Sequence, residues 1–511
     1  MPSHVDYRAA FSLVGTVLKY ITVPFAFPLL VSLWYGESPL PFVVTILVAL
    51  AVGEGLRRLR PEPDLGHREG FLLVGATWLA VPLIGTLPYL VAGQGSVANP
   101  VYALFESMSG FTTTGATVLS DISVERHGHG MMMYRQLTQW LGGMGIVVLM
   151  VAILPELSVG GAQLIKEEAP GFELEKLTPR ITSTARALWK IYAGLTLLAA
   201  AVYYALNLFG PADGMTVYNA VAHALTTMPT GGFSPEARSA EAFAPIVQWA
   251  MIPFMIVAGT NFALLWHALD GNPSRLVDDS EFRAYLAALA SVGGLIAALL
   301  YAGPGLDSTP SQVAPIVGAI EPALRQALFQ VVAIVTTTGY ASMDFNVWSA
   351  PAQTILLFAM FLGGSVGSAA GGIKIVRWYA ISRLIDRELY TTVHPEAVRP
   401  IRVSGSVVDE DTLMGLVGFT LTFLLLFALS TVLLYLDTLR TPGLSLNGLE
   451  AMSVTMATLG NIGPGFGEVG PMNSYGEFSA AAKLYMTFLM WIGRLEIISV
   501  LVLLSPTFWR R

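Results

Sequence analysis

Four short tracts of threonine and glycine recur along the chain, and their backbone carbonyls could coordinate a cation. They read FTTTGAT (111–117), TTMPTGGFS (226–234), VTTTGYA (335–341) and ATLGNIGPG (457–465). Aligned on Gly115, Gly231, Gly339 and Gly463, they lie 116, 108 and 124 residues apart. A near-even period of this kind indicates duplicated structural units. Around one axis, four such tracts could replace the hydration shell of an ion with carbonyl oxygens, as a selectivity filter does.

None of the residues expected to form this ring is acidic. The candidate cation-binding residues are Thr113, Thr114, Gly115, Pro229, Thr230, Gly231, Thr337, Thr338, Gly339, Asn461, Ile462 and Gly463. Carbonyl dipoles without carboxylates suit a large monovalent cation better than Ca²⁺ or Mg²⁺, which prefer carboxylate oxygens. Glycine allows backbone conformations that are closed to other residues. Because the fourth tract departs from the threonine pattern, we expect a pore that is only pseudo-fourfold.

The composition indicates a membrane protein. Of 511 residues, 54% are hydrophobic and 12% are charged, whereas about 25% charged residues are typical of soluble domains. Stretches long enough to cross a bilayer are predicted near 9–34, 40–56, 70–93, 136–154, 187–209, 243–268, 284–302, 351–383, 412–437 and 480–505. The absence of cysteine excludes disulfides and thiolate metal sites. The net charge of −7 is mild and suggests no nucleic-acid partner.

The distribution of basic residues predicts the orientation of the chain. With a cytoplasmic N-terminus and ten alternating spans, 20 of the 28 lysines and arginines would face the cytoplasm. The positive-inside rule favours this orientation over its inverse. All four tracts would then be reached from outside, and both termini would be cytoplasmic.

The chain is expected to be all-α, with a two-helix leader at 1–66 followed by four pore repeats at 67–156, 157–270, 271–408 and 409–511. Each repeat would contain a helix, a re-entrant half-helix and a second helix. The half-helices are predicted at 100–110, 217–227, 322–335 and 446–457, each too short to cross a membrane. Entering from outside, they would point their partly negative carboxyl ends toward the membrane centre, which favours a cation. The alternative is four ordinary extracellular turns rich in glycine and threonine.

The motifs SGFTTTGAT, TGGFS, TTTGY and GNIGPG, with the later GGIK and GRLE, resemble the Trk/Ktr/HKT superfamily of potassium transporters. The two-helix leader is typical of its Trk branch, and the resemblance covers essentially the whole chain. In this family glycine at the key position of every repeat accompanies K⁺ selectivity. The resemblance implies K⁺ uptake across the cytoplasmic membrane, a homodimer and a cytosolic nucleotide-binding ring as partner. It implies no enzyme activity and no cofactor; K⁺ at the filter is the substrate ion.

A second glycine-rich stretch, GGSVGSAAGG at 363–372, interrupts the predicted eighth span. Five glycines in ten residues make a helix costly, which favours a broken helix with an unwound middle. The alternative is a helix-packing face, since Gly363, Gly367 and Gly371 are spaced as GxxxG. In the resembled family the equivalent stretch is a loop that gates the pore. The candidate gating residues are Gly363, Gly364, Gly367, Gly371, Gly372, Lys374 and Arg494.

Arg494 lies inside the last predicted span, where a charge is expensive and indicates a function. Its neighbour Glu496 is two residues away and does not share its helix face, so we expect another partner. The resemblance places Arg494 below the filter, as a fixed barrier to cations. A K⁺–H⁺ or K⁺–Na⁺ symporter remains an alternative because Glu106 and Glu450 fall in the predicted half-helices. A membrane-embedded enzyme is disfavoured because the apolar segments contain no cluster of histidines and acids.

Overall fold

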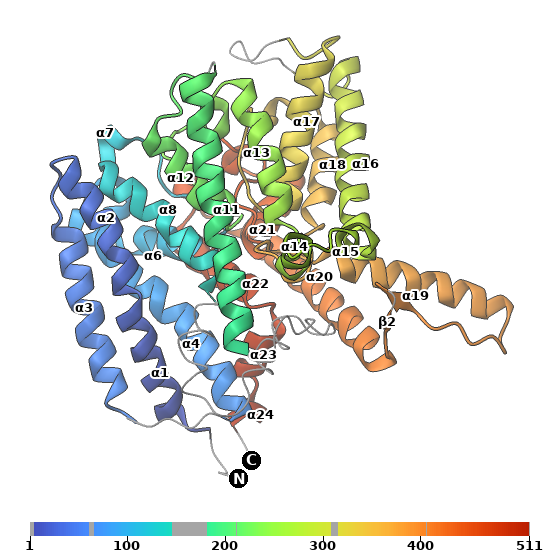
Figure 1. Ribbon diagram of the computed structural model, residues 1–511, viewed down its shortest axis with the longest axis horizontal. Helices are drawn as coiled ribbons and strands as arrows, with labels where there is room; N and C mark the ends of the chain where they lie inside the picture. Colours follow the sequence, from blue (N-terminus) through green and yellow to red (C-terminus); the bar gives the residue numbers. More distant parts are fainter. Residues whose placement is uncertain are drawn as a thin grey trace.

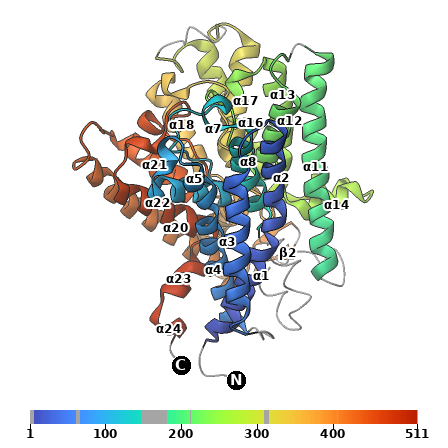
Figure 2. The ribbon, with the colours of Figure 1, turned by 90° about the vertical axis from the view of Figure 1, so that its left-hand side faces the viewer.

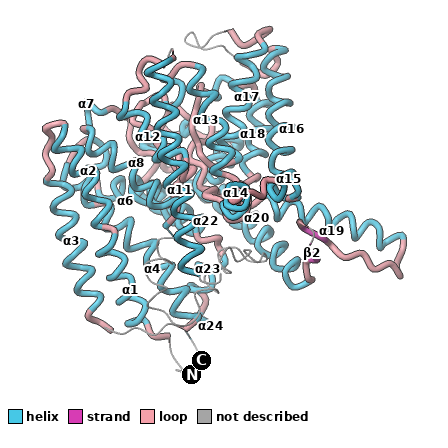
Figure 3. The backbone as a smooth tube through the Cα atoms, viewed as in Figure 1, coloured by secondary structure: helices cyan, strands magenta, loops and turns pink. Residues whose placement is uncertain are grey.

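Helices make up nearly all of the regular structure in the computed structural model, which describes residues 5–60, 66–145, 181–210, 212–307, 315–404 and 406–509. The strands of this described part are β1 (Arg402–Val403) and β2 (Ser406–Val407), which pair as a short antiparallel hairpin (Figure 3). The all-α architecture expected from the sequence is therefore confirmed.

The leader lies at one edge of the molecule, at the left of Figure 1. It contains α1 (Tyr7–Tyr20), α2 (Thr22–Trp34) and α3 (Leu40–Arg57), and Figure 2 shows these helices side by side. Where α1 crosses α3, a Cβ atom on Gly15 or Gly53 would lie within 3.0 Å of the other glycine's carbonyl oxygen. Close beside this crossing, Lys19 Nζ donates to Glu54 Oε2 at 2.7 Å. The charge of Lys19 inside an apolar stretch is thus compensated within the leader.

The four repeats follow in chain order and share one plan, in which a long helix, a half-helix, a tract and a second helix succeed one another. Repeat 1 contains α4 (His67–Gly85), α5 (Leu87–Ala92), η1 (Gly95–Ala98), α6 (Pro100–Phe111), α7 (Val124–His127) and α8 (His129–Gly143). Repeat 2 contains α11 (Ile181–Phe209), α12 (Val217–Thr227), η3 (Ser239–Ala242), α13 (Pro245–Ala258) and α14 (Phe262–Leu269).

Repeats 3 and 4 keep this plan with longer additions. Repeat 3 contains α15 (Ser274–Asp278), α16 (Ser280–Ala302), α17 (Ile320–Val335), η4 (Phe345–Val347), α18 (Ala350–Met360) and α19 (Ile375–Val393). Repeat 4 contains α20 (Glu410–Thr438), α21 (Gly448–Leu459), η5 (Gly467–Val469), η6 (Tyr475–Glu477), α22 (Ala480–Arg494), α23 (Ile498–Leu504) and α24 (Pro506–Trp509). Helix α19 projects away from the body with the hairpin β1–β2 beside it (Figure 1).

The half-helices α6, α12, α17 and α21 form within two residues of the predicted bounds. Their starts are encoded locally. Asn99 accepts a hydrogen bond from the N–H of Val101, with Pro100 at the first helical position. Thr216 caps α12 by accepting from the N–H of Asn219. Asn447 and Glu450 form a reciprocal capping box on α21. At the start of α17, the negative charge of Glu321 in the first turn favours a helix N-terminus.

The number of complete spans differs from the ten that the sequence predicts. In the described part, six helices are long and apolar enough to cross a membrane, or eight if each sharply bent pair is one span. The predicted span at 136–154 runs into residues outside the described part. The predicted span at 351–383 is divided, because α18 ends at Met360 and α19 begins at Ile375. The start of α1 and the last helix α24 lie at the same end of the molecule (Figure 1).

The leader crossing provides a stability test. Gly53→Val should lower the free energy of unfolding by about 1–3 kcal/mol, because the new side chain meets the backbone of α1. Gly55→Val is the matched control: it lies two residues further along α3, where nothing is within 4 Å of a built Cβ. Thermal unfolding in detergent measures both variants, and equal shifts would contradict a close helix crossing at Gly53.

Candidate functional site

Each half-helix leads into a residue in the left-handed backbone conformation. These residues are Thr113, Thr230, Thr337 and Asn461, with φ between 53° and 56°. The N–H of each donates to the carbonyl three residues earlier, at 3.0–3.3 Å. A β-branched threonine rarely adopts positive φ, whereas asparagine tolerates it. Because the same strained conformation recurs in all four tracts, it marks a shared structural requirement.

The second tract lies in a different register from the one the sequence alignment predicts. A second positive φ occurs two residues after the left-handed residue, at Gly115 (79°), Gly339 (72°) and Gly463 (102°). In the second tract the residue with this conformation is Gly232 (77°), so the alignment on Gly231 is wrong by one position. The physical reason is Pro229, whose ring locks φ near −65°. The left-handed turn must therefore start at Thr230.

The four tracts close into a ring through glycine–carbonyl contacts. A Cβ atom on any of the four glycines would lie within 3.0 Å of a carbonyl oxygen of another tract. The pairs are Gly115 with Gly231, Gly232 with Thr338, Gly339 with Ile462, and Gly463 with Thr114. Tract 1 thus contacts tract 2, tract 2 contacts tract 3, tract 3 contacts tract 4, and tract 4 contacts tract 1. A ring of backbone with no room for side chains is the arrangement that carbonyl coordination requires.

Buried side chains bond tract 2 to helix α8 and tract 4 to tract 1. Gln139 of α8 donates from Nε2 to the Gly231 carbonyl at 2.6 Å and accepts from the N–H of Phe233 at 3.0 Å. Asn461 donates from Nδ2 to Thr114 Oγ1 at 2.9 Å, which joins tract 4 to tract 1. The departure of tract 4 from the threonine pattern therefore has a function, because an amide reaches a neighbour that a hydroxyl would not.

A second set of side chains supports the segment that leaves each tract. The position seven residues before the left-handed residue holds Glu106, His223 and Gln330, all buried. His223 Nε2 lies 3.0 Å from Ser234 Oγ, and the Gln330 amide hydrogen-bonds Ser342. In tract 4 the neighbouring Ser453 accepts from the N–H of Phe466 at 2.8 Å. His223, isolated in the sequence, is thus a structural support.

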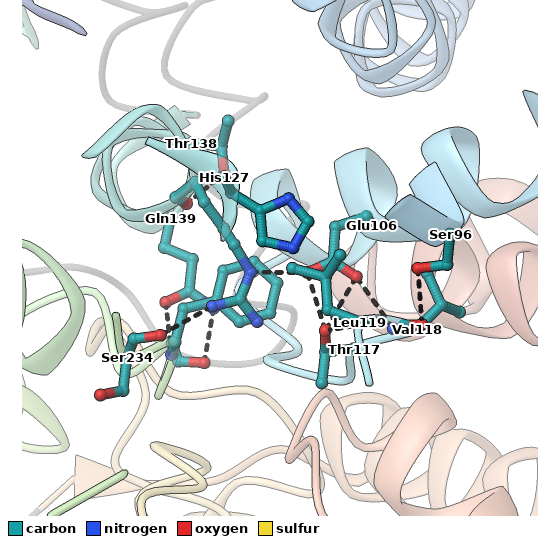
Figure 4. Close-up of polar contacts among 12 residues, drawn as sticks. Ser96, Glu106, Thr117, Val118, Leu119, His127, Thr138, Gln139 and Ser234 are labelled. Carbon is teal, nitrogen blue, oxygen red and sulfur yellow. Dashed lines mark hydrogen bonds and ion pairs between the residues drawn. The ribbon is translucent and has the colours of Figure 1, made fainter. Parts of the chain in front are cut away.

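Glu106, labelled in Figure 4, forms the supporting ion pair of repeat 1 with Arg135. Arg135 Nε donates to Glu106 Oε1 at 2.6 Å, and both side chains are at most 1% exposed. Glu106 also accepts from the Thr117 hydroxyl and the Val118 N–H, each at 3.0 Å. Arg135 Nη1 continues to the Ser234 carbonyl of tract 2 at 2.9 Å. This ion pair therefore connects half-helix α6 and helix α8 with the segments that leave tracts 1 and 2.

The two carboxylates that left the symporter alternative open are both used structurally. Glu106 is paired with Arg135 and accepts hydrogen bonds on both oxygens. Glu450 caps α21 by accepting from the N–H of Asn447 at 2.8 Å. Neither geometry is that of a carboxylate poised to relay protons along a pore. Among the described residues, no group of three or more histidines and acids could hold a metal ion.

The glycine-rich stretch forms an irregular loop between α18 and α19. Its glycines therefore do not lie on a helix, and the GxxxG packing alternative is wrong for this chain. The loop docks on the 102° bend between α13 and α14. Ser365 and Ala369 donate their N–H groups to the carbonyls of Gly259 and Ala258, at 2.8 and 3.3 Å. In return, the N–H of Phe262 donates to the Gly367 carbonyl at 3.1 Å. The glycine-rich loop of repeat 3 therefore packs against the bend of repeat 2.

Two cationic side chains also contact this loop. Arg494 donates from Nη1 to the Ala369 carbonyl at 2.9 Å and from Nη2 to the Gly142 carbonyl, at the end of α8, at 3.1 Å. Lys374 is buried and donates to the Ala370 carbonyl. Glu496 pairs with Arg377. The prediction that Arg494 has a partner other than Glu496 is therefore confirmed, and its contacts include the loop itself.

Sequence reasoning located the four tracts and the loop but missed the residues that connect them. Gly232, Gln139 and the Glu106–Arg135 pair belong to the site and were not predicted. A usable signal exists for Glu106, because aligning the tracts on the left-handed residue places Glu106, His223 and Gln330 in one column. No comparable pattern in the sequence points to Gln139, which reaches a different repeat.

Comparisons with known proteins show relatives that match this chain over nearly its whole length. The family described as TrkH, cation transport protein, matches residues 41–511. The Trk system potassium uptake protein TrkH of Vibrio parahaemolyticus is 36% identical over 514 residues, covering 99% of this chain and 100% of that protein. The Escherichia coli K12 protein of that name is 33% identical over 513 residues, with coverages of 99% and 100%. The crystal structure of the potassium transporter TrkH from Vibrio parahaemolyticus superposes with a TM-score of 0.83, at 35% identity, covering 99% of this chain and 100% of that chain.

Removing one partner of the buried ion pair should destabilise the protein strongly. Glu106→Gln leaves Arg135 buried beside a neutral amide, so we expect a loss of about 3–5 kcal/mol in the free energy of unfolding. Glu321→Gln is the matched control. Its partner Arg325 is buried, but Glu321 itself is 53% exposed, so a much smaller loss is expected. Denaturant unfolding in detergent compares the two variants, and similar losses would show that burial of the Glu106 pair is unimportant.

Proposed function

Since this chain belongs to the TrkH family of cation transport proteins, we propose that it takes up K⁺ across the cytoplasmic membrane through the ring of four tracts. Relatives that match the chain over their full length are named potassium uptake proteins. The observation that carries the proposal is the closed ring of glycine–carbonyl contacts. Carbonyl oxygens crowded around one axis can replace the hydration shell of a monovalent cation.

Selectivity for K⁺ over Na⁺ is expected to come from the backbone. The proposed filter residues are those predicted from the sequence, with Gly232 added as the ring glycine of repeat 2. No side chain in this set is acidic, so the site offers dipoles rather than full negative charge. The carboxyl ends of α6, α12, α17 and α21 lead into the ring, and their partial negative charges favour a cation there.

The loop at 363–372 is proposed as the gate. It is irregular, it docks on another repeat, and its Gly371 packs against the inner end of tract 4, where a Cβ would lie 2.7 Å from the Gly460 carbonyl oxygen. Gly371 also hydrogen-bonds Thr337 of tract 3 at 2.7 Å. In this position the loop would obstruct the pore beneath the filter and would have to move for ions to pass. Lys374 and Arg494, both bonded to loop carbonyls, would hold it closed and repel cations.

The assembly and the orientation are part of the proposal. The positive-inside distribution supports cytoplasmic termini. The family resemblance supports a homodimer that docks on a cytosolic nucleotide-binding ring. Such a partner would act on the cytoplasmic side of the loop, which is where regulation of the proposed gate is needed.

Flux measurements on purified protein in liposomes distinguish channel from symporter. K⁺ or Rb⁺ flux that follows the K⁺ gradient alone supports the channel, whereas flux that requires a proton or Na⁺ gradient supports the symporter. Growth of K⁺-uptake-deficient cells at low K⁺ provides the cellular test. Equal permeation of Na⁺ and K⁺ by the unmodified protein would refute a K⁺-selective filter.

The two adjacent glycines of tract 2 test the ring. Gly232→Ala should reduce K⁺ flux per folded molecule by about tenfold or more, because a residue with a side chain is strained by roughly 1–2 kcal/mol at positive φ and its Cβ meets the backbone of tract 3. Gly231→Ala is the matched control. Its Cβ meets the side chain of Gln139, so the smaller loss is expected there. The reverse order would restore the register in which Gly231 is the ring glycine.

A related substitution tests selectivity. Gly115→Ser places a side chain against the Gly231 carbonyl at a φ of 79°, which should move that oxygen away from the axis. We expect the K⁺/Na⁺ permeability ratio to fall while Na⁺ flux persists. A ratio equal to that of the unmodified protein would remove Gly115 from the filter.

Arg494 tests the gate. Arg494→Ala removes the bonds to the Ala369 and Gly142 carbonyls together with a positive charge, whose repulsion of a cation 4 Å away is about 4 kcal/mol at an effective dielectric constant of 20. Flux per folded molecule should rise, and Arg494→Lys should retain much of the barrier because the charge remains. Normal stability with unchanged flux in the alanine variant would contradict both a barrier and a structural role.

A further inference from the structure

One hydrogen bond connects the proposed gate directly to the proposed filter. The N–H of Gly371, in the glycine-rich loop, donates to Thr337 Oγ1 of tract 3 at 2.7 Å. Both residues are buried. Gly372 lies close by, since a Cβ built on it would be 3.7 Å from Thr337 Cγ2. The contact is therefore part of a packed interface between loop and tract.

The equivalent hydroxyls of the other tracts do not make this bond. Thr230 Oγ1 donates to the carbonyl of its own neighbour Pro229 at 2.6 Å. Thr113 Oγ1 is buried and has no hydrogen-bond partner within the described part of the chain. In tract 4 the position is Asn461, whose amide nitrogen is used toward Thr114 and Met490. Four equivalent positions thus have different uses, and Thr337 is the one that bonds the loop.

The Gly371 N–H depends on this acceptor. A buried backbone donor without a partner costs about 1–3 kcal/mol, so the closed position of the loop requires an oxygen at this point. There is no room for a side chain at Gly371, because a Cβ atom built there would lie 2.7 Å from the Gly460 carbonyl oxygen and 3.0 Å from Asn461 Cβ. The loop is held between tracts 3 and 4, and the Thr337 hydroxyl satisfies its inward-facing amide.

We propose that the Thr337 hydroxyl is a latch that holds the glycine-rich loop closed against the filter. Thr337 is a positioning residue in this role, and the role rests on the proposed function of the loop as the gate. When the loop leaves, the hydroxyl loses the amide donor and its oxygen becomes available at the inner end of the filter. By linkage, closure of the loop then weakens cation binding at this oxygen, and a bound cation disfavours the closed loop by the same factor. Ion occupancy of the filter and the position of the loop would thereby be coupled.

Thr337→Val tests the latch because valine keeps the β-branched shape but lacks the acceptor oxygen. Because the buried Gly371 N–H is left without an acceptor, the balance between closed and open loop should shift by about fivefold or more toward open. In single-channel recordings, closed intervals should shorten by that factor. Thr337→Ser retains the acceptor oxygen and should keep closed intervals close to those of the unmodified protein, whatever its effect on conductance. Thr422→Val is the matched control, since the Thr422 hydroxyl bonds within α20 to the Gly418 carbonyl at 2.8 Å.

Hydrogen exchange of the segment 363–374 in detergent provides a readout that does not need conduction. The valine variant should exchange faster in this segment than the unmodified protein and the serine variant. If Thr337→Val misfolds, Thr337→Ala replaces it in the same comparison. Unchanged exchange in a folded variant lacking the hydroxyl overturns the latch. Faster exchange in the valine variant, together with an unmodified protein that conducts no K⁺, supports the contact between loop and tract and refutes the proposed function, so the two failures are distinguishable.

Discussion

The need to pair every backbone N–H at membrane depth determines the form of the tracts. Water is absent from the hydrocarbon region, and an unpaired peptide group there is expensive. Each tract meets this requirement by turning left-handed as its half-helix ends, so that N–H groups bond back to that helix. The same turn directs the next glycine against a neighbouring tract. Ring closure and carbonyl presentation therefore follow from one backbone constraint.

The supports behind the ring are chemically different although their positions are equivalent. Glu106 is half of a buried ion pair, His223 bonds a serine hydroxyl, and Gln330 uses its amide. Lys483 occupies in repeat 4 the position of Arg135 in repeat 1, counted from the left-handed residue. It donates to the Gly476 carbonyl at 2.7 Å and lies over the Tyr102 ring at 3.9 Å. Equivalent positions thus support the ring in each repeat, but the type of interaction differs from one repeat to the next.

The sequence was sufficient to predict what depends on local patterns. The half-helices were predicted within two residues because their apolar runs and flanking tracts are contiguous in the chain. The break in the eighth span was predicted because five glycines disfavour a helix. The register of tract 2 was missed, since two adjacent glycines look alike in an alignment and only the fixed φ of Pro229 separates them. The bond from Gln139 to tract 2 and the contact of the loop with Gly259 could not be predicted, because they depend on which repeats become neighbours.

The order of contacts around the ring has a consequence for how the pore can change. Each tract presents a glycine to the next and a carbonyl to the previous one, which is the head-to-tail arrangement that closes a cyclic oligomer. In an oligomer of identical subunits, every substitution would be repeated at each step around the axis. Here the four steps are covalently joined, so each can be altered alone. This freedom allows asparagine at one step and a loop-bonded threonine at another, so that a single loop contacts a ring that is otherwise built from four similar tracts.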